Sequence, residues 1–162
     1  MTDTATKTIR ITRIFDAPRE RVWKAWTDPA EMKKWWGPKD FTAPDIKTDL
    51  REGGKFLYCM RGPKGSEFDK DMWSGGTFKE VLPMEKIVAT DHFADAQGNV
   101  ISPAEYGMPG DWGEMLVTFT FEDAGEGKTK LTLVHEGHPA DIADMANEGW
   151  NQSLDKFAAA LA

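Results

Sequence analysis

Two histidines, each able to bind a metal or transfer a proton, stand three residues apart in the string His135-Glu136-Gly137-His138. The zincin arrangement, however, needs two histidines four residues apart on a helix. This string instead closes a predicted strand, and a glycine interrupts it. A third ligand would have to come from Asp141, Asp144 or His92, and nothing in the sequence requires one. We therefore predict no metal site and no cofactor.

His135 has a second potential role, because it continues a strand face that carries Leu131 and Leu133. Successive side chains of a strand alternate between its two faces, so this imidazole is expected to point inward with the leucines. In an apolar interior it could serve as a polar anchor for a ligand, or as a general acid or base. A hydrogen-bonded core histidine is the alternative, and it is the interpretation we favour.

The remaining reactive residue types favour structural roles. Cys59 is the single cysteine, and its place within a predicted strand is typical of a small buried hydrophobe rather than a thiolate nucleophile. No Gly-x-Ser-x-Gly elbow is present. Gly53-Gly54 and Gly75-Gly76 do not lead into helices, so we expect bends or bulges of a curved sheet there, not phosphate loops.

The segment 94–112 has no clear period and contains several glycines and prolines. A loop of this length within a compact domain is usually functional or disordered. It carries apolar side chains that a solvated loop does not need, so it is either a lid over a pocket or a long hairpin connection that packs its own aromatics. We expect a solvated rim, rather than an acid–base pair, from the nearby carboxylates Asp69, Asp71, Glu105, Asp111 and Glu114.

Hydrophobic periodicity predicts the elements that position these residues. A strand is expected over residues 8–15, followed by two short helices. Asp16 is the expected cap of the first helix, with Pro18 in its first turn. The second helix is expected to start after Thr27-Asp28-Pro29 and to end at Gly37-Pro38.

The second helix carries the adjacent residues Trp35 and Trp36. Neighbouring residues on a helix diverge by about 100°, so the two rings cannot face the same way. We expect one ring to pack into the core and the other to lie at a pocket rim or an interface.

Alternating residues and short turns predict a run of antiparallel strands in the rest of the chain. A long amphipathic helix begins at Pro139, with its apolar stripe at steps of three and four residues. This order predicts an α+β fold in which a curved antiparallel sheet of about six to seven strands wraps around the final helix. The strands are expected at residues 41–50, 55–61, 72–82, 86–93, 114–122 and 128–136.

A curved sheet and a straight helix cannot meet everywhere, so we expect an apolar cavity between them. The chain is rich in side chains suited to line it, with seven Trp, nine Phe and eight Met. The residues that we expect to line the cavity or its mouth are Trp36, Phe56, Tyr58, Met60, Trp73, Phe93, Tyr106, Met108, Trp112, Met115, His135, Met145 and Trp150.

Composition narrows the possible partners. The net charge of −7 argues against a nucleic-acid surface and against binding to anionic membranes, both of which need basic clusters. No stretch approaches the roughly 20 apolar residues of a membrane span. Residues 1–7 are expected to form a flexible leader without signal-peptide character, and residues 8–162 a single cytoplasmic domain.

Several short motifs together resemble one family over nearly the whole chain. The sequence is similar to the activator-of-heat-shock-ATPase-like branch of the SRPBCC superfamily, which also includes START, polyketide-cyclase and birch-pollen-allergen-like proteins. The motifs that carry this resemblance are Phe15-Asp16-Ala17-Pro18, Val22-Trp23, Trp26-Thr27-Asp28-Pro29, Trp35-Trp36-Gly37-Pro38, Asp49-Leu50-Arg51-Glu52-Gly53-Gly54, Trp73-Ser74-Gly75-Gly76, Tyr106-Gly107-Met108-Pro109-Gly110-Asp111-Trp112 and Glu148-Gly149-Trp150-Asn151 with Leu154.

The resemblance implies a helix-grip fold with a ligand cavity under the long helix, but not one chemistry. We expect a protein that binds a small hydrophobic, aromatic or lipid-like molecule. One alternative is an enzyme of the polyketide-cyclase or hydrolase type, with His135, Tyr58 or a carboxylate of the 94–112 segment in the reaction. The other is a co-chaperone that stimulates a heat-shock ATPase, although this sequence does not contain the N-terminal domain of the eukaryotic activator. Both a monomer and a homodimer are compatible with the sequence.

Overall fold

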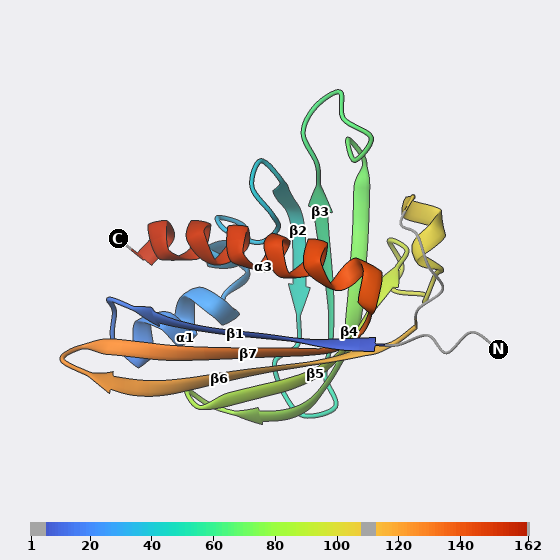
Figure 1. Cartoon of the computed structure of the whole chain (residues 1–162). Coiled ribbons are helices and arrows are strands. Elements are labelled where there is room, and N and C mark those ends of the chain that lie inside the picture. Colours follow the sequence, from blue (N-terminus) through green and yellow to red (C-terminus); the bar gives the residue numbers. More distant parts are fainter. Residues whose placement is uncertain (1–5, 108–112, 162) are drawn as a thin grey trace.

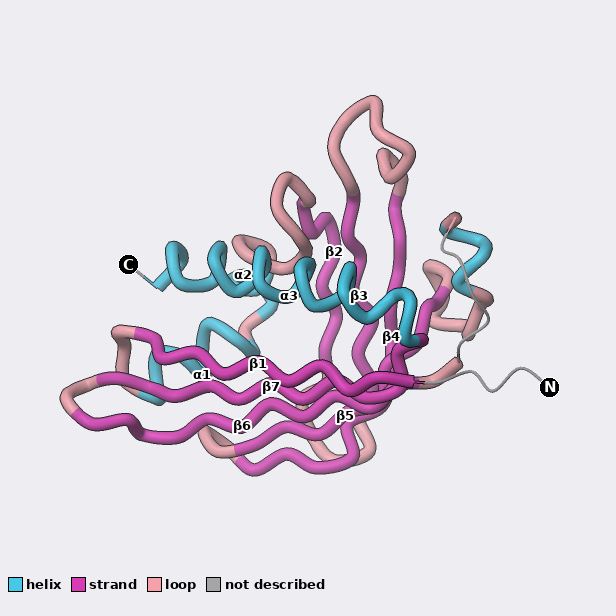
Figure 2. The backbone as a smooth tube through the Cα atoms, in the orientation of Figure 1, coloured by secondary structure: helices cyan, strands magenta, loops and turns pink. Residues whose placement is uncertain are grey.

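One continuous antiparallel sheet dominates the computed structural model of this chain (Figure 1), which describes residues 6–107 and 113–161. From one edge to the other, its strands are β1 (Thr6–Phe15), β7 (Lys128–Pro139), β6 (Met115–Gly125), β5 (Lys86–Ala94), β4 (Asp71–Leu82), β3 (Lys55–Arg61) and β2 (Thr42–Thr48). From β2 to β7, strands that are consecutive in the chain are also neighbours in the sheet, whereas β1 joins the sheet beside β7. The sheet bends strongly, so that β2 and β3 run across the direction of β1 and β7 (Figures 1 and 2).

The α-helices lie on the inner side of this bend (Figure 1). Between β1 and β2 are α1 (Arg19–Thr27) and α2 (Pro29–Met32), and the 3-10 helix η1 (Pro103–Tyr106) lies between β5 and β6. The long α3 (Ala140–Leu161) crosses the concave face of the sheet (Figure 1). The predicted α+β helix-grip fold, with its two short helices after the first strand, is therefore confirmed.

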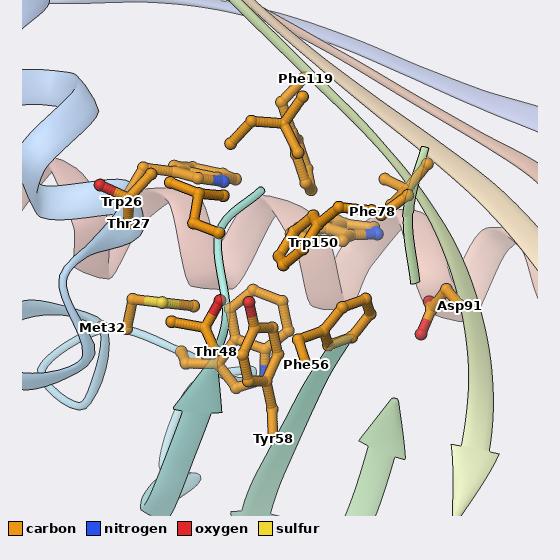
Figure 3. Close-up of a pocket in the computed structure, with 15 residues that line it drawn as sticks. Trp26, Thr27, Met32, Thr48, Phe56, Tyr58, Phe78, Asp91, Phe119 and Trp150 are labelled. Atoms are coloured by element: carbon orange, nitrogen blue, oxygen red, sulfur yellow. The ribbon is translucent and has the colours of Figure 1, made fainter. Parts of the chain in front are cut away.

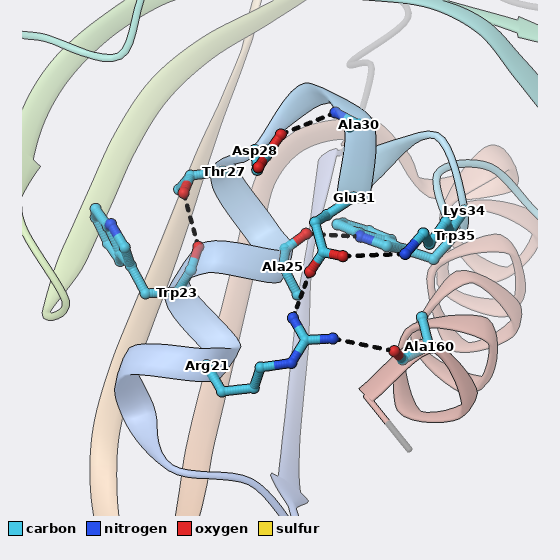
Figure 4. Close-up of polar contacts among 10 residues, drawn as sticks. All are labelled: Arg21, Trp23, Ala25, Thr27, Asp28, Ala30, Glu31, Lys34, Trp35 and Ala160. Atoms are coloured by element: carbon cyan, nitrogen blue, oxygen red, sulfur yellow. Dashed lines mark hydrogen bonds and ion pairs between the residues drawn. The ribbon is translucent and has the colours of Figure 1, made fainter.

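The starts of the two short helices differ from each other. Asp16 was the expected cap of α1, and this expectation was wrong: Pro18 occupies the cap position and no side chain caps the helix. Asp16 lies two residues too early for its carboxylate to reach the first free N–H groups. Asp28 does cap α2, because its side chain accepts a hydrogen bond from the Ala30 N–H at 3.0 Å (Figure 4). The second helix ends at Met32, well before the expected Gly37-Pro38.

A polar network holds α1, α2 and the end of α3 together (Figure 4). Arg21 pairs with Glu31 of α2 and donates to the Ala160 carbonyl at 3.3 Å. The hydrogen bond from Arg21, followed by that from Lys34, lowers the pKa of Glu31. The Trp35 indole N–H donates to the Ala25 carbonyl at 2.9 Å. These bonds fix where the chain leaves α2, and therefore where the two adjacent tryptophans point.

An aromatic cluster around Trp26 packs between α1, the sheet and the C-terminal half of α3. The Trp26 ring centroid lies 4.5 Å from that of Trp35, 4.8 Å from that of Phe119 and 5.1 Å from that of Phe157. Trp35 and Phe157 are completely buried. Edge-to-face contacts of this kind add to the free energy gained from burying the rings. The cluster closes the space between sheet and helix at this end of the molecule.

Gly76 lies where β4 passes closest to its neighbours. A Cβ atom at this position would stand 1.9 Å from the Thr90 carbonyl oxygen and 2.8 Å from the Phe56 ring. We expected a bend or a bulge at Gly75-Gly76, and the structure has no bulge there: the pairing of β4 with β5 shifts further along, between Phe78 and Glu80. Glycine is needed at Gly76 for close approach of the backbone, not for an unusual backbone conformation.

Gly76→Ala is therefore expected to destabilise the protein by at least about 2 kcal/mol, because the Thr90 backbone oxygen cannot move away as a flexible side chain could. Urea unfolding followed by circular dichroism measures the change. Gly113→Ala is the control, since a Cβ atom there meets nothing within 4 Å and should change the free energy of unfolding by less than about 0.5 kcal/mol. Equal stability of the two variants would contradict the packing argument.

Candidate functional site

A cavity of about 400 Å³ lies between the N-terminal half of α3 and the inner face of the sheet. Thioether, aromatic and aliphatic side chains make up most of its wall, with a few polar groups among them. The principal lining residues are Trp36, Phe41, Met60, Phe68, Met72, Ser74, Asp91, Phe93, Met115, His135, His138, Ile142, Met145, Ala146, Glu148 and Trp150.

A second, smaller cavity of about 40 Å³ lies between the first cavity and the aromatic cluster (Figure 3). Trp36, Asp91 and Trp150 line both cavities and therefore form the boundary between them. The centroids of the two tryptophan rings are 5.7 Å apart, and the rings are nearly perpendicular. The inner space has room for a few water molecules or a small chemical group.

Nine of the expected lining residues line one of these two cavities. Seven contact the larger one: Trp36, Met60, Phe93, Met115, His135, Met145 and Trp150. Phe56 and Tyr58 contact the smaller one. Of the adjacent tryptophans, Trp35 is buried in the core and Trp36 faces the cavities, which confirms the expected division.

Trp73 and Tyr106 line neither cavity, contrary to expectation. Trp73 lies on the outer face of β4, because its neighbours Met72 and Ser74 point to the cavity and side chains alternate. The Tyr106 hydroxyl instead donates to the Ala94 carbonyl and accepts a hydrogen bond from the backbone N–H of Trp73. The expected lining residues Met108 and Trp112 lie outside the described residues.

The described part of the segment 94–112 forms a connection anchored on the sheet through Tyr106, and residues 95–107 do not line either cavity. Of the nearby carboxylates, Asp69 and Asp71 form ion pairs with Arg61 at 3.2 and 3.3 Å in a half-exposed hairpin. Glu105 and Glu114 are exposed, while Asp111 lies outside the described residues. These described carboxylates are thus solvated, as expected, but none of them lines either cavity.

His135 points inward, as the strand alternation predicted, and contacts two polar partners. Its Nδ1 accepts a hydrogen bond from the Trp150 indole N–H at 3.0 Å. Its Nε2 lies 3.0 Å from Oδ2 of Asp91, in a direction unsuited to a hydrogen bond, so this contact is electrostatic. Because Nδ1 is an acceptor, the imidazole is neutral and carries its proton on Nε2.

A bulge brings His138 to the same face of β7 as His135. Residues three apart on a regular strand point to opposite faces. Gly137, with φ of +104°, is the extra residue of the bulge, and it turns His138 to the face of the strand that carries His135. The two imidazole rings consequently lie 4.2 Å apart and nearly perpendicular.

Burial lowers the pKa of His138 to about 4. Across the part of the chain that the structure describes, no three His, Cys, Asp or Glu residues gather in an arrangement that could hold a metal ion.

Asp91 is a polar lining residue of both cavities that our sequence reasoning missed. It follows Ile87 and Ala89 on the inward face of β5, and its carboxylate turns toward the cavities (Figure 3). An acidic residue that continues a buried strand face was the available signal. Phe41 and Phe68, whose rings lie 6.1 Å apart at the mouth, both come from loops and were not among the expected lining residues.

Two other titratable groups stay protonated at neutral pH. Burial, assisted by the nearby charges of Asp71 and Asp45, raises the pKa of Cys59 to about 12, and the thiol is buried as expected. Burial also raises the pKa of the Tyr58 hydroxyl, against a smaller opposing effect of its hydrogen bond with Thr48. Neither side chain is available as an anionic nucleophile or base.

The family model described as "Activator of Hsp90 ATPase homolog 1-like protein" matches residues 16–162. The chain belongs to this family. The match confirms the branch of the SRPBCC superfamily that the sequence motifs indicated. No curated protein matches this chain. Within the described residues, we find no helix with the length and apolar character needed to span a bilayer.

Solved bacterial structures share the fold over nearly the full chain. Protein CV1439 from Chromobacterium violaceum is 33% identical, with a TM-score of 0.77 over 95% of this chain and 96% of that one. The AHSA1 protein from Silicibacter pomeroyi is 24% identical, with a TM-score of 0.73 over 96% and 97%. CalU16 from Micromonospora echinospora is 22% identical, with a TM-score of 0.65 over 97% and 77%.

The buried His138 makes stability pH-dependent. Its pKa falls from 6.5 to about 4 on folding, so the unfolded chain binds the proton more tightly. The contribution of His138 to the free energy of unfolding is fully present above pH 6.5. It decreases by about 3 kcal/mol as the pH falls toward about 4. Urea unfolding at several pH values should show this loss in the wild type and a shallower slope in His138→Gln. Parallel slopes would contradict the assignment.

Proposed function

We propose that this protein binds a small hydrophobic, aromatic or lipid-like molecule in the cavity of about 400 Å³ between the sheet and α3. The observation that carries the proposal is the size of this cavity combined with its apolar wall. Ligand pockets usually measure about 300–1,000 Å³ and combine apolar walls with a few polar groups. A packed core of this size normally leaves only voids close to the size of a water molecule.

The chemistry of the wall supports an adaptable binding site. Four methionines, Met60, Met72, Met115 and Met145, face the cavity from three strands and from α3. Their flexible, polarisable side chains can adjust to ligands of different shape. Met145 is 48% exposed although it lies on the apolar stripe of α3, which places an apolar group at the opening.

An enzyme of the cyclase or hydrolase type is less well supported by this geometry. Both His135 nitrogens face protein groups, Trp150 and Asp91, so neither is directed at a bound molecule. The raised pKa of Tyr58 keeps the phenol protonated. Loss of turnover in His135→Ala with retained ligand binding is the result that would favour catalysis instead.

The family match supports a second candidate, a protein that stimulates a heat-shock chaperone ATPase. An ATPase assay with the chaperone from the same organism tests it directly. Stimulation that survives when the cavity is filled by substitution would separate this role from ligand binding.

Ligand binding itself is tested with the neutral fluorescent probe N-phenyl-1-naphthylamine. We expect saturable one-to-one binding, and a loss of at least about tenfold in affinity for Ala146→Phe, whose ring would occupy the cavity. The control is Ala159→Phe, the same change at an exposed position of the same helix, which should bind like the wild type. No saturable binding by the wild type, or equal affinities of the two variants, would contradict the proposal.

A further inference from the structure

We propose that the ligand of this cavity is a cation, namely an aromatic or otherwise apolar molecule with a protonated amine that contacts the Asp91 carboxylate. This inference rests on the proposed function and adds the chemical class of the ligand. It follows from the charges in the wall and from the hydrogen bonds that the polar groups already make.

Among the described residues, the cavity wall contains carboxylates but no strongly basic side chain. Asp91 and Glu148 contribute carboxylates, and no lysine or arginine lines the space. The other titratable residues of the wall are histidines. His138 remains neutral at neutral pH because burial lowers its pKa to about 4, and the Nδ1 of His92 lies 3.0 Å from the Phe93 carbonyl. The wall therefore offers a ligand carboxylate no lysine or arginine as a partner.

Lys156 lies near the mouth, but its hydrogen-bond donors are already used. Its ammonium group donates to the carbonyls of Gly37, Pro38 and Phe41 at 3.0, 3.1 and 3.1 Å. An ammonium group has three N–H donors, so all of them are engaged. Desolvation also lowers the pKa of this amine. Lys156 thus holds the loop of the mouth against α3 instead of binding an anion.

The Asp91–His135 contact carries a net negative charge. The Trp150 N–H donates to Nδ1 of His135, which keeps the imidazole neutral, because an imidazolium would place two protons against each other. A neutral imidazole does not compensate the charge of Asp91. The indole of Trp150 therefore acts as a positioning group that preserves the negative charge at the cavity wall.

No described residue donates a hydrogen bond to the Asp91 carboxylate. This side chain is only 21% exposed, so most of it is also shielded from water. The neighbouring Nε2 of His135 lies at 3.0 Å but is not directed for a hydrogen bond. A mostly buried carboxylate is costly unless a donor or a positive charge accompanies it. Because Asp91 lines both cavities, a ligand in the larger one can place a donor directly against it.

The aromatic side chains around Asp91 also suit a cation. Trp36 and Trp150 line the same boundary between the cavities, and Phe93 lies two residues along the same strand. Indole and phenyl faces attract ammonium groups, and do so more strongly when the cation is desolvated. Aromatic walls with one carboxylate are a combination that recognises organic amines.

The test compares three ligands of one shape and different charge: 1-naphthylmethylamine, 1-ethylnaphthalene and 1-naphthoate. Each is used to displace N-phenyl-1-naphthylamine from the wild-type protein at neutral pH. We expect the amine to bind about ten- to a hundredfold more tightly than the hydrocarbon, and the carboxylate to bind most weakly. Asp91→Asn should remove the preference for the amine while neutral ligands still bind.

Asp144→Asn is the matched control, because it removes the same charge from an exposed position of α3 that does not line the cavity. It should keep the preference for the amine, which separates contact with Asp91 from the effect of the overall net charge. Circular dichroism and thermal unfolding establish that each variant is folded, and the wild-type comparison decides the question by itself if Asp91→Asn does not fold.

The outcomes separate the two proposals. If the hydrocarbon displaces the probe but the amine binds no better, or if folded Asp91→Asn keeps the preference, the cation inference is overturned and the proposed function stands. If the wild type binds neither the probe nor any of the three ligands, the proposed function itself fails.

Discussion

The structure depends on how the two halves of α3 meet the sheet. The C-terminal half packs through Leu154 and Phe157 onto the aromatic cluster around Trp26, where both side chains are completely buried. This contact fixes the helix at one end of a bent sheet. The N-terminal half then crosses the concave face without touching it everywhere, and the larger cavity is the space that remains.

The polar side chains of the interior meet at the boundary between the packed C-terminal half of α3 and the cavity under its N-terminal half. Trp36 and Trp150 separate the two cavities, and Trp150 extends its indole N–H to His135. Asp91 completes the arrangement from β5. These polar contacts therefore require that β5, β7 and α3 keep their relative positions. The aromatic cluster that anchors α3 supplies that rigidity, because a shift of the helix would move Trp150 away from His135.

Periodicity predicted most of the fold because each strand has an inner and an outer face. It located β3 without error and the other strands to within a few residues. It failed where a local motif was assigned to the wrong position, as with Asp16 at the start of α1. The assignment of Trp73 to the cavity was also wrong, and periodicity was not the cause: alternation with Met72 places Trp73 on the opposite face. Side-chain type was given too much weight there, and strand geometry too little.

The sequence by itself determined the order of elements, the inward direction of His135 and the apolar character of the interior, since all three follow from local alternation and composition. Only the tertiary structure decided that Asp91 would face His135, because β5 and β7 are not neighbours in the sheet and β6 lies between them. Only the bulge at Gly137 placed His138 beside His135. The size of the cavity likewise follows from the bend of the sheet and from the position of α3 on it. Both depend on contacts between residues far apart in the chain.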